Sequence, residues 1–295
     1  MLKTVMSRLE KIIVDTDAGG DPDDTLAIAL ASKLPNILAF VSSDETGDGK
    51  RAEVVRAIVG GRAPVFTGLP SPYPGTHVLD QLHIPPTLHP ESVDDGFLDL
   101  INHAAQDSSL LWVGIGSYTN LAWLHDKNPE LAESMRVVLM GGRMNMKEGD
   151  RPEHNFKVDP EAAMSVATSF PHLTYVPATT TMHERVRVDV SHPLISYLAR
   201  GNEPWQAASL ENFNVWFERR FDASYQHDAL TLAIALGAVR NLSLTRVRAA
   251  RDGGLSEDET CRALAVSGGV EHDAFWQWVW NVLDASPESI QKDQS

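Results

Sequence analysis

Cysteine is nearly absent from this chain. Cys261 is the only one in 295 residues. A single cysteine excludes an internal disulfide, and it excludes a zinc site built from several thiolates. One unpaired thiol fits a reducing compartment, where disulfides are rare.

Basic residues are scarce relative to acidic ones. The chain has 25 Lys and Arg against 40 Asp and Glu, which gives a formal net charge of −15 and a pI of about 5.1. A protein with this balance has no general attraction for polyanions. We therefore expect neither a nucleic-acid polymer nor a membrane as a partner, although a local site can still bind a small phosphate or a nucleoside.

Long apolar runs are missing as well. No segment approaches the roughly 18 apolar residues that a membrane-spanning helix needs. The first residues, MLKTVMSRLEKIIVD, lack the apolar core of a signal peptide. The sequence therefore predicts a soluble, cytoplasmic protein.

Short apolar runs alternate with helix-patterned segments along the chain. The runs lack polar alternation, which is typical of strands buried on both faces. This β–α order predicts an α/β fold with a mostly parallel central sheet and helices on both faces, as a single domain over residues 1–295. The predicted strands are Lys11–Asp15, Ile37–Ser42, Pro64–Thr67, Leu110–Ile115, Arg136–Met140, Leu173–Val176 and Leu244–Arg248. The predicted helices are Asp24–Ser32, Lys50–Val59, Ser92–Ala105, Asn120–His125, Pro160–Thr168 and Ala229–Leu236.

Three further segments stand apart by composition. Gly68–Pro90 is proline-rich and predicts a long loop. Residues 202–226 are aromatic-rich, and the helical spacing of several of these aromatics fits either a packed helix or a lid or wall against a planar ligand. The last residues, 286–295, are expected to fray.

The stretch IIVDTDAGGDPDDTLAIAL, residues 12–30, is unusually acidic. Its five aspartates are Asp15, Asp17, Asp21, Asp23 and Asp24. The first two lie at the expected C-terminal end of a strand, where open α/β sheets place ligands, and the last two begin a helix. Carboxylates crowded this closely repel one another, and a hard divalent cation such as Ca²⁺ or Mg²⁺ relieves that repulsion. Helix capping accounts for one or two of these aspartates but not for five.

Two other acidic motifs fit this stretch less well. An EF-hand loop needs Glu at its twelfth position, where this sequence has Leu26 or Ile28. A phosphatase of the haloacid dehalogenase type also begins with a strand and Asp-x-Asp, but its motif has Thr or Val where Gly19 stands. A Mg²⁺-dependent phosphatase-like hydrolase stays open as an alternative. It requires a basic residue near the metal, and the first lysine after the motif is Lys33.

Four segments together resemble the inosine–uridine-type nucleoside hydrolases. The acidic stretch is similar to the family's strand that ends in Asp-x-Asp-x-Gly and continues into Asp-Asp-Ala-x-Ala. GSYTNLA at 116–122 is similar to Gly-x-x-Thr-Asn-x-Ala. VLMGG at 138–142, followed by EHNFKVDPEAA, is similar to the segment that includes Glu-Phe-Asn-x-x-x-Asp-Pro-Glu-Ala-Ala. HDALTLA at 227–233 is similar to a His-Asp helix start. The four segments keep the family's order from residue 12 to about 235.

The resemblance implies a calcium centre. In this family a Ca²⁺ ion holds a water and the ribose hydroxyls. Carried over, Asp17, Asp24 and Asp228 are the carboxylate ligands, and the backbone carbonyl of Ile115 is a further ligand. Asp15 supports the site from close behind.

The resemblance also implies how the reaction proceeds. Asp23 is the general base for the attacking water. Glu153 and Asn155 contact the ribose hydroxyls. His227 matches the histidine that protonates the departing base in some members, and a histidine suits proton transfer near neutral pH.

Several positions depart from the family's pattern. Asp21 is an extra acid that competes for the base or ligand role. Asp44 takes the place of an Asn after the second strand, and we expect it to contact the substrate. The other departures are His154 for a Phe, Thr179 for an Asp, Asn145 or Asp150 for an Asn, and His89 near the place of an absent His-Gly pair.

The sequence thus predicts a calcium-dependent enzyme that hydrolyses the N-glycosidic bond of a ribonucleoside to give free base and ribose. Members of this family form dimers or tetramers, so the resemblance implies a homodimer or homotetramer. A second alternative is a non-catalytic nucleoside or sugar binder that kept the metal. The sequence does not specify a purine or a pyrimidine base.

Overall fold

A computed structural model describes residues 10–43, 47–72, 91–93, 96–219 and 221–285. Most of the expected proline-rich loop, residues 73–90, lies outside the described residues, and so does the expected frayed tail, residues 286–295.

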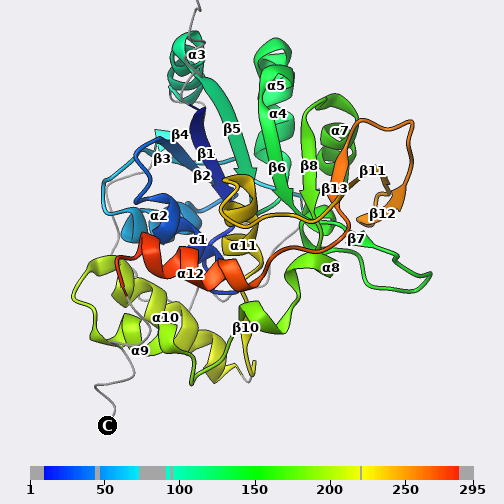
Figure 1. Cartoon of the computed structure of the whole chain (residues 1–295). Helices are drawn as coiled ribbons and strands as arrows, with labels where there is room; N and C mark the ends of the chain where they lie inside the picture. The colour runs from blue at the N-terminus through cyan, green and yellow to red at the C-terminus, as the bar shows by residue number, and fades with distance from the viewer. Residues whose placement is uncertain (1–9, 44–46, 73–90, 94–95, 220, 286–295) are drawn as a thin grey trace, which may run out of the picture.

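One large sheet organises the molecule (Figure 1). Its strand order is β4-β3-β2-β1-β5-β6-β8-β13-β11-β12-β7. β1 lies inside the sheet and pairs in parallel with β2 and β5. β11 is antiparallel to both of its neighbours, whereas the other described pairings of this sheet are parallel. The strands are β1 (Glu10–Thr16), β2 (Ile37–Ser42), β3 (Val65–Thr67), β4 (Glu91–Ser92), β5 (Ser109–Gly114), β6 (Arg136–Met140), β7 (Arg143–Met144), β8 (Leu173–Val176), β11 (Leu244–Ala249), β12 (Gly254–Glu257) and β13 (Leu264–Val266).

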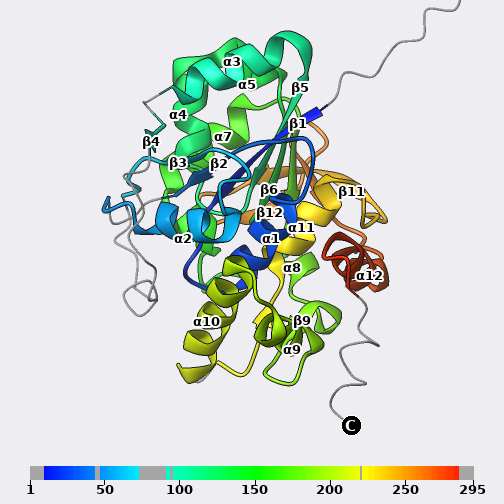
Figure 2. The ribbon, with the colours of Figure 1, turned by 90° about the vertical axis from the view of Figure 1, so that its left-hand side faces the viewer.

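Helices cover both faces of this sheet. Ile12 and Val14 of β1 join the apolar cluster that contains α1, α2, α11 and α12, whereas Ile13 joins the cluster on the other face with α3, α4, α5 and α7. Figure 2 shows α3, α4 and α5 on one side, and α9 and α10 as an outer layer on the other. The helices are α1 (Asp23–Ala31), α2 (Lys50–Val59), α3 (Phe97–Asp107), α4 (Thr119–Lys127), α5 (Pro129–Ser134), α6 (His154–Val158), α7 (Pro160–Ser169), α8 (Ala178–Thr181), α9 (Pro193–Arg200), α10 (Pro204–Glu218), α11 (His227–Ala235) and α12 (Asp273–Val282). A short 3-10 turn, η2 (Glu184–Val186), and a two-stranded antiparallel ribbon of β9 (Arg187–Val188) and β10 (Ser224–Tyr225) complete the described elements. The predicted α/β fold is confirmed.

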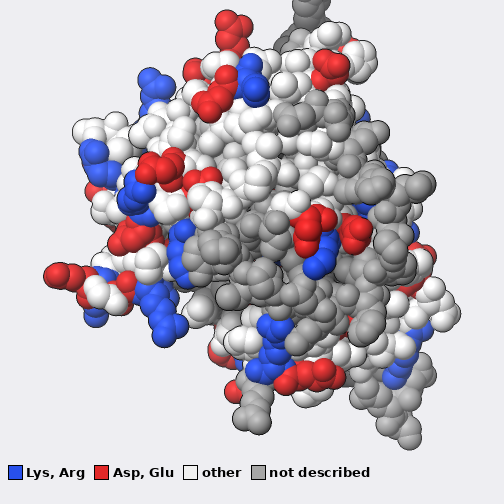
Figure 3. Space-filling model, turned by 180° about the vertical axis from the view of Figure 1, so that it is seen from behind, with Lys and Arg blue, Asp and Glu red and all other residues white. Residues whose placement is uncertain are grey.

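The described part of one outer face carries charges of both signs. Acidic and basic side chains are interspersed on the face seen from behind in Figure 3. Of the helices in the described part of the chain, none combines the length and the apolar character that crossing a bilayer requires.

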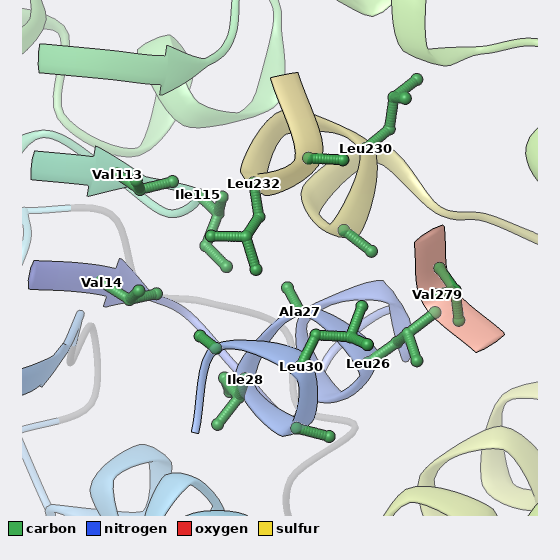
Figure 4. Packing of buried hydrophobic residues seen from close by; sticks show 14 of the residues in the cluster. Val14, Leu26, Ala27, Ile28, Leu30, Val113, Ile115, Leu230, Leu232 and Val279 are labelled. Carbon is green, nitrogen blue, oxygen red and sulfur yellow. The ribbon is translucent and has the colours of Figure 1, made fainter. Parts of the chain in front are cut away.

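The pair α1 and α11 forms the centre of one apolar layer (Figure 4). Every residue of α1 is buried, which is typical of a helix that is apolar on all sides. Leu26 and Leu230 come from the two helices, and Val14 and Val113 come from the strands beneath them. This packing fixes the N-termini of α1 and α11 beside the C-terminal ends of β1 and β5.

Some predicted elements were wrong. The predicted helix Ser92–Ala105 begins only at Phe97, after Gly96 with a φ of 86°, and Ser92 belongs to β4. The strand predicted at Leu244–Arg248 forms, but it is antiparallel and largely exposed, with Val247 as its one buried residue. α9, α12, β12 and β13 have no counterpart among the predicted elements.

Candidate metal centre and pocket

The acidic stretch lies at the carboxyl edge of the sheet. Asp15 is the next-to-last residue of β1, and Asp17 follows the end of that strand. Gly19, with a φ of 104°, allows the chain to turn into α1, whose first two residues are Asp23 and Asp24. Pro22 is the N-cap of α1 and makes no side-chain capping bond. Asp23 Oδ1 accepts from the Asp24 amide at 3.2 Å, so a helix-start bond accounts for one of these aspartates and not for the group.

Three buried carboxylates converge at this edge. Asp23, Asp24 and Asp228 each offer an oxygen, and these oxygens lie within 4.8 Å of one another. Asp228 is the second residue of α11, so the contact between α1 and α11 brings the two helix N-termini together. Each of the three side chains is only 4% exposed.

The carboxylates of the cluster repel one another strongly. Burial raises the pKa of Asp23 well above its usual range, and the charges of Asp21 and Asp24 raise it further. Burial and the charge of Asp17 raise the pKa of Asp24, and burial and the charge of Asp23 raise that of Asp228. Such a set of buried oxygen donors fits a hard divalent cation, which neutralises the charge and satisfies the oxygens together.

Asp15 is held from behind by the GSYTN segment. Asn120 donates one hydrogen bond to Asp15 Oδ1 at 2.9 Å and another to the Ser42 carbonyl at 3.2 Å. Asn120 Oδ1 in turn accepts from the Leu69 amide at 2.9 Å. Asp15 Oδ2 is buried with no hydrogen-bond partner among the described residues. Asp15 is therefore buried near the end of β1 and hydrogen-bonded to the GSYTN segment.

Hydroxyl groups hold two of the carboxylates at this edge. Thr16 Oγ1 donates to Asp24 Oδ1, and Ser224 Oγ donates to Asp21 Oδ1. Burial raises the pKa of Asp21 to about 7. Asp21, the acid that is extra relative to the family's pattern, is thus held by Ser224 of β10.

A pocket of about 610 Å³ opens above the carboxylates. Its lining includes all of the described residues that the sequence analysis proposed as ligands, general base, sugar contacts or proton donor. These are Asp17, Asp23, Asp24, Ile115, Glu153, Asn155, His227 and Asp228. Asp17 lines the pocket without belonging to the close triplet, and its side chain is 16% exposed.

The start of α6 forms one wall of the pocket. Glu153 is the N-cap of α6, and its carboxylate accepts from the amides of Asn155 at 3.3 Å and Phe156 at 3.2 Å. Asn155 is buried, and its Nδ2 donates to the Met140 carbonyl at 3.1 Å. His154 replaces the family's Phe and extends into the pocket, with Nε2 at 3.9 Å from Asp17 Oδ2.

His227 begins α11 and faces the same pocket. Its Nδ1 lies 2.6 Å from Thr181 Oγ1. Burial lowers the pKa of His227 to about 4, so the imidazole is neutral at pH 7. With Thr181 as donor to Nδ1, the Nε2–H is left to donate to a ligand.

Comparison with known sequences decides the family. The sequence profile of the inosine-uridine preferring nucleoside hydrolases matches residues 12–280. The chain belongs to this family. The matched region contains every proposed site residue, and the buried acidic triplet agrees with the metal dependence of these hydrolases.

Related proteins support the assignment of this nucleoside hydrolase family member at two levels. The pyrimidine-specific ribonucleoside hydrolase RihA of Salmonella schwarzengrund is 32% identical over 181 residues, which are 54% of this chain and 57% of RihA. The chain thus matches little more than half the length of that relative. Among solved structures, an inosine-guanosine nucleoside hydrolase shares the fold with a TM-score of 0.74 and 18% identity, over 94% of this chain and 99% of the other. The inosine-uridine preferring nucleoside hydrolase of Bacillus anthracis gives a TM-score of 0.69 and 15% identity, over 93% and 99%.

The aromatic segment of this nucleoside hydrolase family member divides between core and pocket. Trp205 and Phe213 of α10 are buried in the apolar core. Trp216 and Phe221 stack on each other with ring centres 3.9 Å apart, and both line the pocket. Trp205 and Phe213 thus correspond to the packed helix, and Trp216 and Phe221 lie where the aromatic wall was expected.

Not every position singled out from the sequence belongs to the described pocket. Asp44 and His89 fall outside the described residues. Thr179, Asn145 and Asp150 are exposed and do not belong to the lining of the described pocket.

Several residues that shape the site were not predicted from the sequence. Thr16, Thr181 and Ser224 fix acidic or imidazole groups through their hydroxyls, and no motif distinguishes such hydroxyls from others. Asn120 had a signal, because it lies in the GSYTN motif directly after a strand. Arg51, which donates to the Ala18 carbonyl at 3.0 Å and lowers the pKa of Asp24, had none.

Proposed function

We propose that this protein hydrolyses the N-glycosidic bond of a ribonucleoside in a calcium-dependent reaction, releasing the free base and ribose. The observation that carries the proposal is the buried carboxylate triplet at the base of a pocket large enough for a nucleoside. Family membership supports the reaction class.

The proposed calcium ligands are Asp17, Asp24 and Asp228, with the backbone carbonyl of Ile115. These groups line one pocket, and carboxylate and carbonyl oxygens are the ligands that Ca²⁺ prefers. When bound, a divalent cation supplies the Lewis acidity that lowers the pKa of the attacking water. Asp15 keeps the strand end in position through its bond with Asn120.

Asp23 is the proposed general base. It lies directly before a proposed ligand, Asp24, and within 4.8 Å of another, Asp228. A second carboxylate beside the metal ligands is suited to take the proton that the water loses as it attacks C1′. The triplet geometry also allows Asp23 to be a metal ligand itself. Calcium titration of an Asp23 variant distinguishes a ligand from a general base.

Glu153 and Asn155 are the proposed sugar contacts. Both side chains are held by α6 and β6 before any substrate enters, because Glu153 caps the helix and Asn155 is bonded to the Met140 carbonyl. Fixed polar groups lower the entropic cost of orienting the ribose. His227 then donates a hydrogen bond to the departing base, and this bond strengthens as negative charge builds up on the base.

The proposed wall for the base is the Trp216–Phe221 stack. Aromatic rings at this place can stack on either a purine or a pyrimidine. Related proteins differ in the same respect, since one is named pyrimidine-specific and another inosine-guanosine. A substrate panel therefore has to include both classes.

Ribose release by a reducing-sugar assay tests the proposal. The panel contains uridine, cytidine, inosine, guanosine and adenosine, each with Ca²⁺ and with EGTA, for wild type and Asp24→Asn. Asp126→Asn, which removes an exposed carboxylate from α4, is the matched control. We expect calcium-dependent release from at least one nucleoside, lost in Asp24→Asn and kept in the control.

Two results would contradict this proposal. Release that persists in EGTA and in Asp24→Asn would remove the metal from the reaction. Calcium binding with no release from any nucleoside would favour a non-catalytic binder, and release of inorganic phosphate from a nucleotide in place of base would favour the phosphatase alternative.

A further inference from the structure

Basic side chains are concentrated around the pocket of this acidic protein. Five of the 23 lining residues are Lys or Arg, against 25 of 295 in the whole chain. The share in the pocket is therefore more than twice the average. The five are Arg51, Arg143, Arg151, Lys157 and Arg219.

One of the five lies beside the carboxylate cluster of Asp23, Asp24 and Asp228, called the acidic floor below. Arg51 is buried, donates to the Ala18 carbonyl and lowers the pKa of Asp24. It therefore offsets part of the negative charge of the carboxylate cluster.

Arg143 and Arg151 are placed differently. Arg143 is half-buried and Arg151 is exposed, and both line the pocket. Among the residues that the structure describes, neither has a carboxylate within 4.0 Å of its guanidinium. Their charge is thus available to a ligand in the pocket.

These cations share a short segment with the proposed sugar contacts. Arg151 precedes Glu153 by two residues, and Lys157 follows Asn155 by two residues on α6. Arg143 lies in β7, just after β6. The aromatic stack comes instead from α10 and the residues that follow it. Arg219 belongs with the stack, because it lies between Trp216 and Phe221 in the sequence. Arg143, Arg151 and Lys157 are therefore associated with the sugar side of the pocket, and Arg219 with the base side.

We infer that the substrate carries a phosphate on its ribose, so that the preferred substrate class is a ribonucleoside 5′-monophosphate. This inference rests on the proposed function. The ribose diol is assigned to the metal floor and the base to Trp216 and His227, so the 5′-oxygen is the substituent left to face Arg143 and Arg151. A phosphate carries close to two negative charges at pH 7 and accepts bidentate bonds from arginine, whereas a neutral nucleoside makes no use of these cations.

The chemistry is the same hydrolysis with a charged substrate. The water oxygen forms a bond to C1′, the C1′–N bond breaks, and its electron pair leaves with the base. One water proton passes to Asp23, the base takes up a proton from solvent as it departs, and Asp23 then returns its proton to solvent. The products are the free base and ribose 5-phosphate, and the phosphate ester remains intact.

Charge balance is the competing explanation for Arg143 and Arg151. Cations that only offset the acidic floor would support calcium binding and catalysis for every substrate equally. Cations that bind a phosphate act on the nucleotide alone. The ratio of kcat/KM for a 5′-monophosphate to kcat/KM for its parent nucleoside separates the two explanations.

The experiment measures this ratio for wild type, Arg143→Ala, Arg151→Ala and the control Arg240→Ala, which removes an exposed arginine outside the pocket lining. Uridine, inosine and adenosine are each paired with their 5′-monophosphates. We expect a wild-type ratio above one and a loss of about tenfold in each pocket variant, as for one lost charge-assisted hydrogen bond. The control keeps the wild-type ratio. Added NaCl lowers kcat/KM for the nucleotide more than for the nucleoside, because screening weakens the charged contact.

A wild-type ratio below one overturns the inference, and so does the same ratio in all variants. An equal loss for both substrates, with weaker calcium binding, also overturns it in favour of charge balance. Absence of base release from either substrate would instead contradict the proposed function. Calorimetry with ribose 5-phosphate and with ribose then tests the phosphate site. Binding of ribose 5-phosphate but not of ribose, weakened about tenfold in Arg151→Ala, supports the site. No binding of ribose 5-phosphate overturns it.

Discussion

Replacement of Asn120 by alanine tests the support beneath the metal centre. Asn120 is 1% exposed and makes three hydrogen bonds, to Asp15, to the Ser42 carbonyl and from the Leu69 amide. Truncation leaves these three groups without the amide partner, at about 1–3 kcal/mol for each buried group. Because relaxation and water entry recover part of the loss, we expect a decrease of about 3–5 kcal/mol in the free energy of unfolding.

The assay is thermal unfolding in EGTA, so that cation binding does not contribute to the difference. For a domain of this size, the expected loss corresponds to a decrease in Tm of roughly 6–20 °C. Asn120→Asp keeps the acceptor for Leu69 but places a carboxylate against Asp15, so its Tm should be at least as low. Asn102→Ala is the matched control, because exposed Asn102 makes one side-chain bond, with Asn128. A Tm of Asn120→Ala within 2 °C of this control would refute the reasoning.

Three other predictions concern the pocket and an outer helix. His227→Ala should lower kcat by about a hundredfold, and His227→Gln, which keeps a donor, should lose less; equal kcat values for all three proteins would contradict the role. Trp216→Ala should raise KM about tenfold with a smaller change in kcat, because one stacking face is lost; an unchanged KM would exclude the aromatic wall. Burial lowers the pKa of His192 to about 4, so the unfolded state binds more protons between pH 6.5 and 4. The free energy of unfolding should therefore fall as pH decreases through this window, and His192→Asn, which keeps an N-cap side chain, should flatten the pH dependence measured by urea unfolding.

The parts of the fold that the sequence predicts well are the parallel strands and the helices between them. The centre of β1, Ile12 to Val14, and the part of α1 after Thr25 are apolar throughout, so their burial follows directly from composition. β11 shows the opposite case. The sequence analysis places a buried parallel strand at Leu244–Arg248, but the alternation of Arg246, Val247 and Arg248 fits an antiparallel strand with one exposed face. α12 carries no side-chain cap, and its aromatic run gave no helix signal.

The site divides in a similar way. Asp23 and Asp24 were found because acidic residues at a strand–helix junction are costly without a cation, whereas Asp228 followed from the resemblance of HDALTLA to the family's His-Asp helix start. The contact of Asp228 with the other two depends on the packing of α1 against α11, which no local pattern encodes. Arg143 and Arg151 were missed for the same reason, since nothing in their neighbouring residues indicates that they line a pocket.

Calcium titration of Asp23→Asn and Asp24→Asn, combined with kcat on the best nucleoside of the panel, bears most directly on how the carboxylates share their roles. With Asp24 as ligand and Asp23 as base, we expect Asp24→Asn to lose both calcium binding and activity. Asp23→Asn should bind calcium within about tenfold of wild type and lose kcat by about a hundredfold or more. Loss of calcium binding in Asp23→Asn would make Asp23 a ligand, and full kcat in that variant would remove it from the reaction.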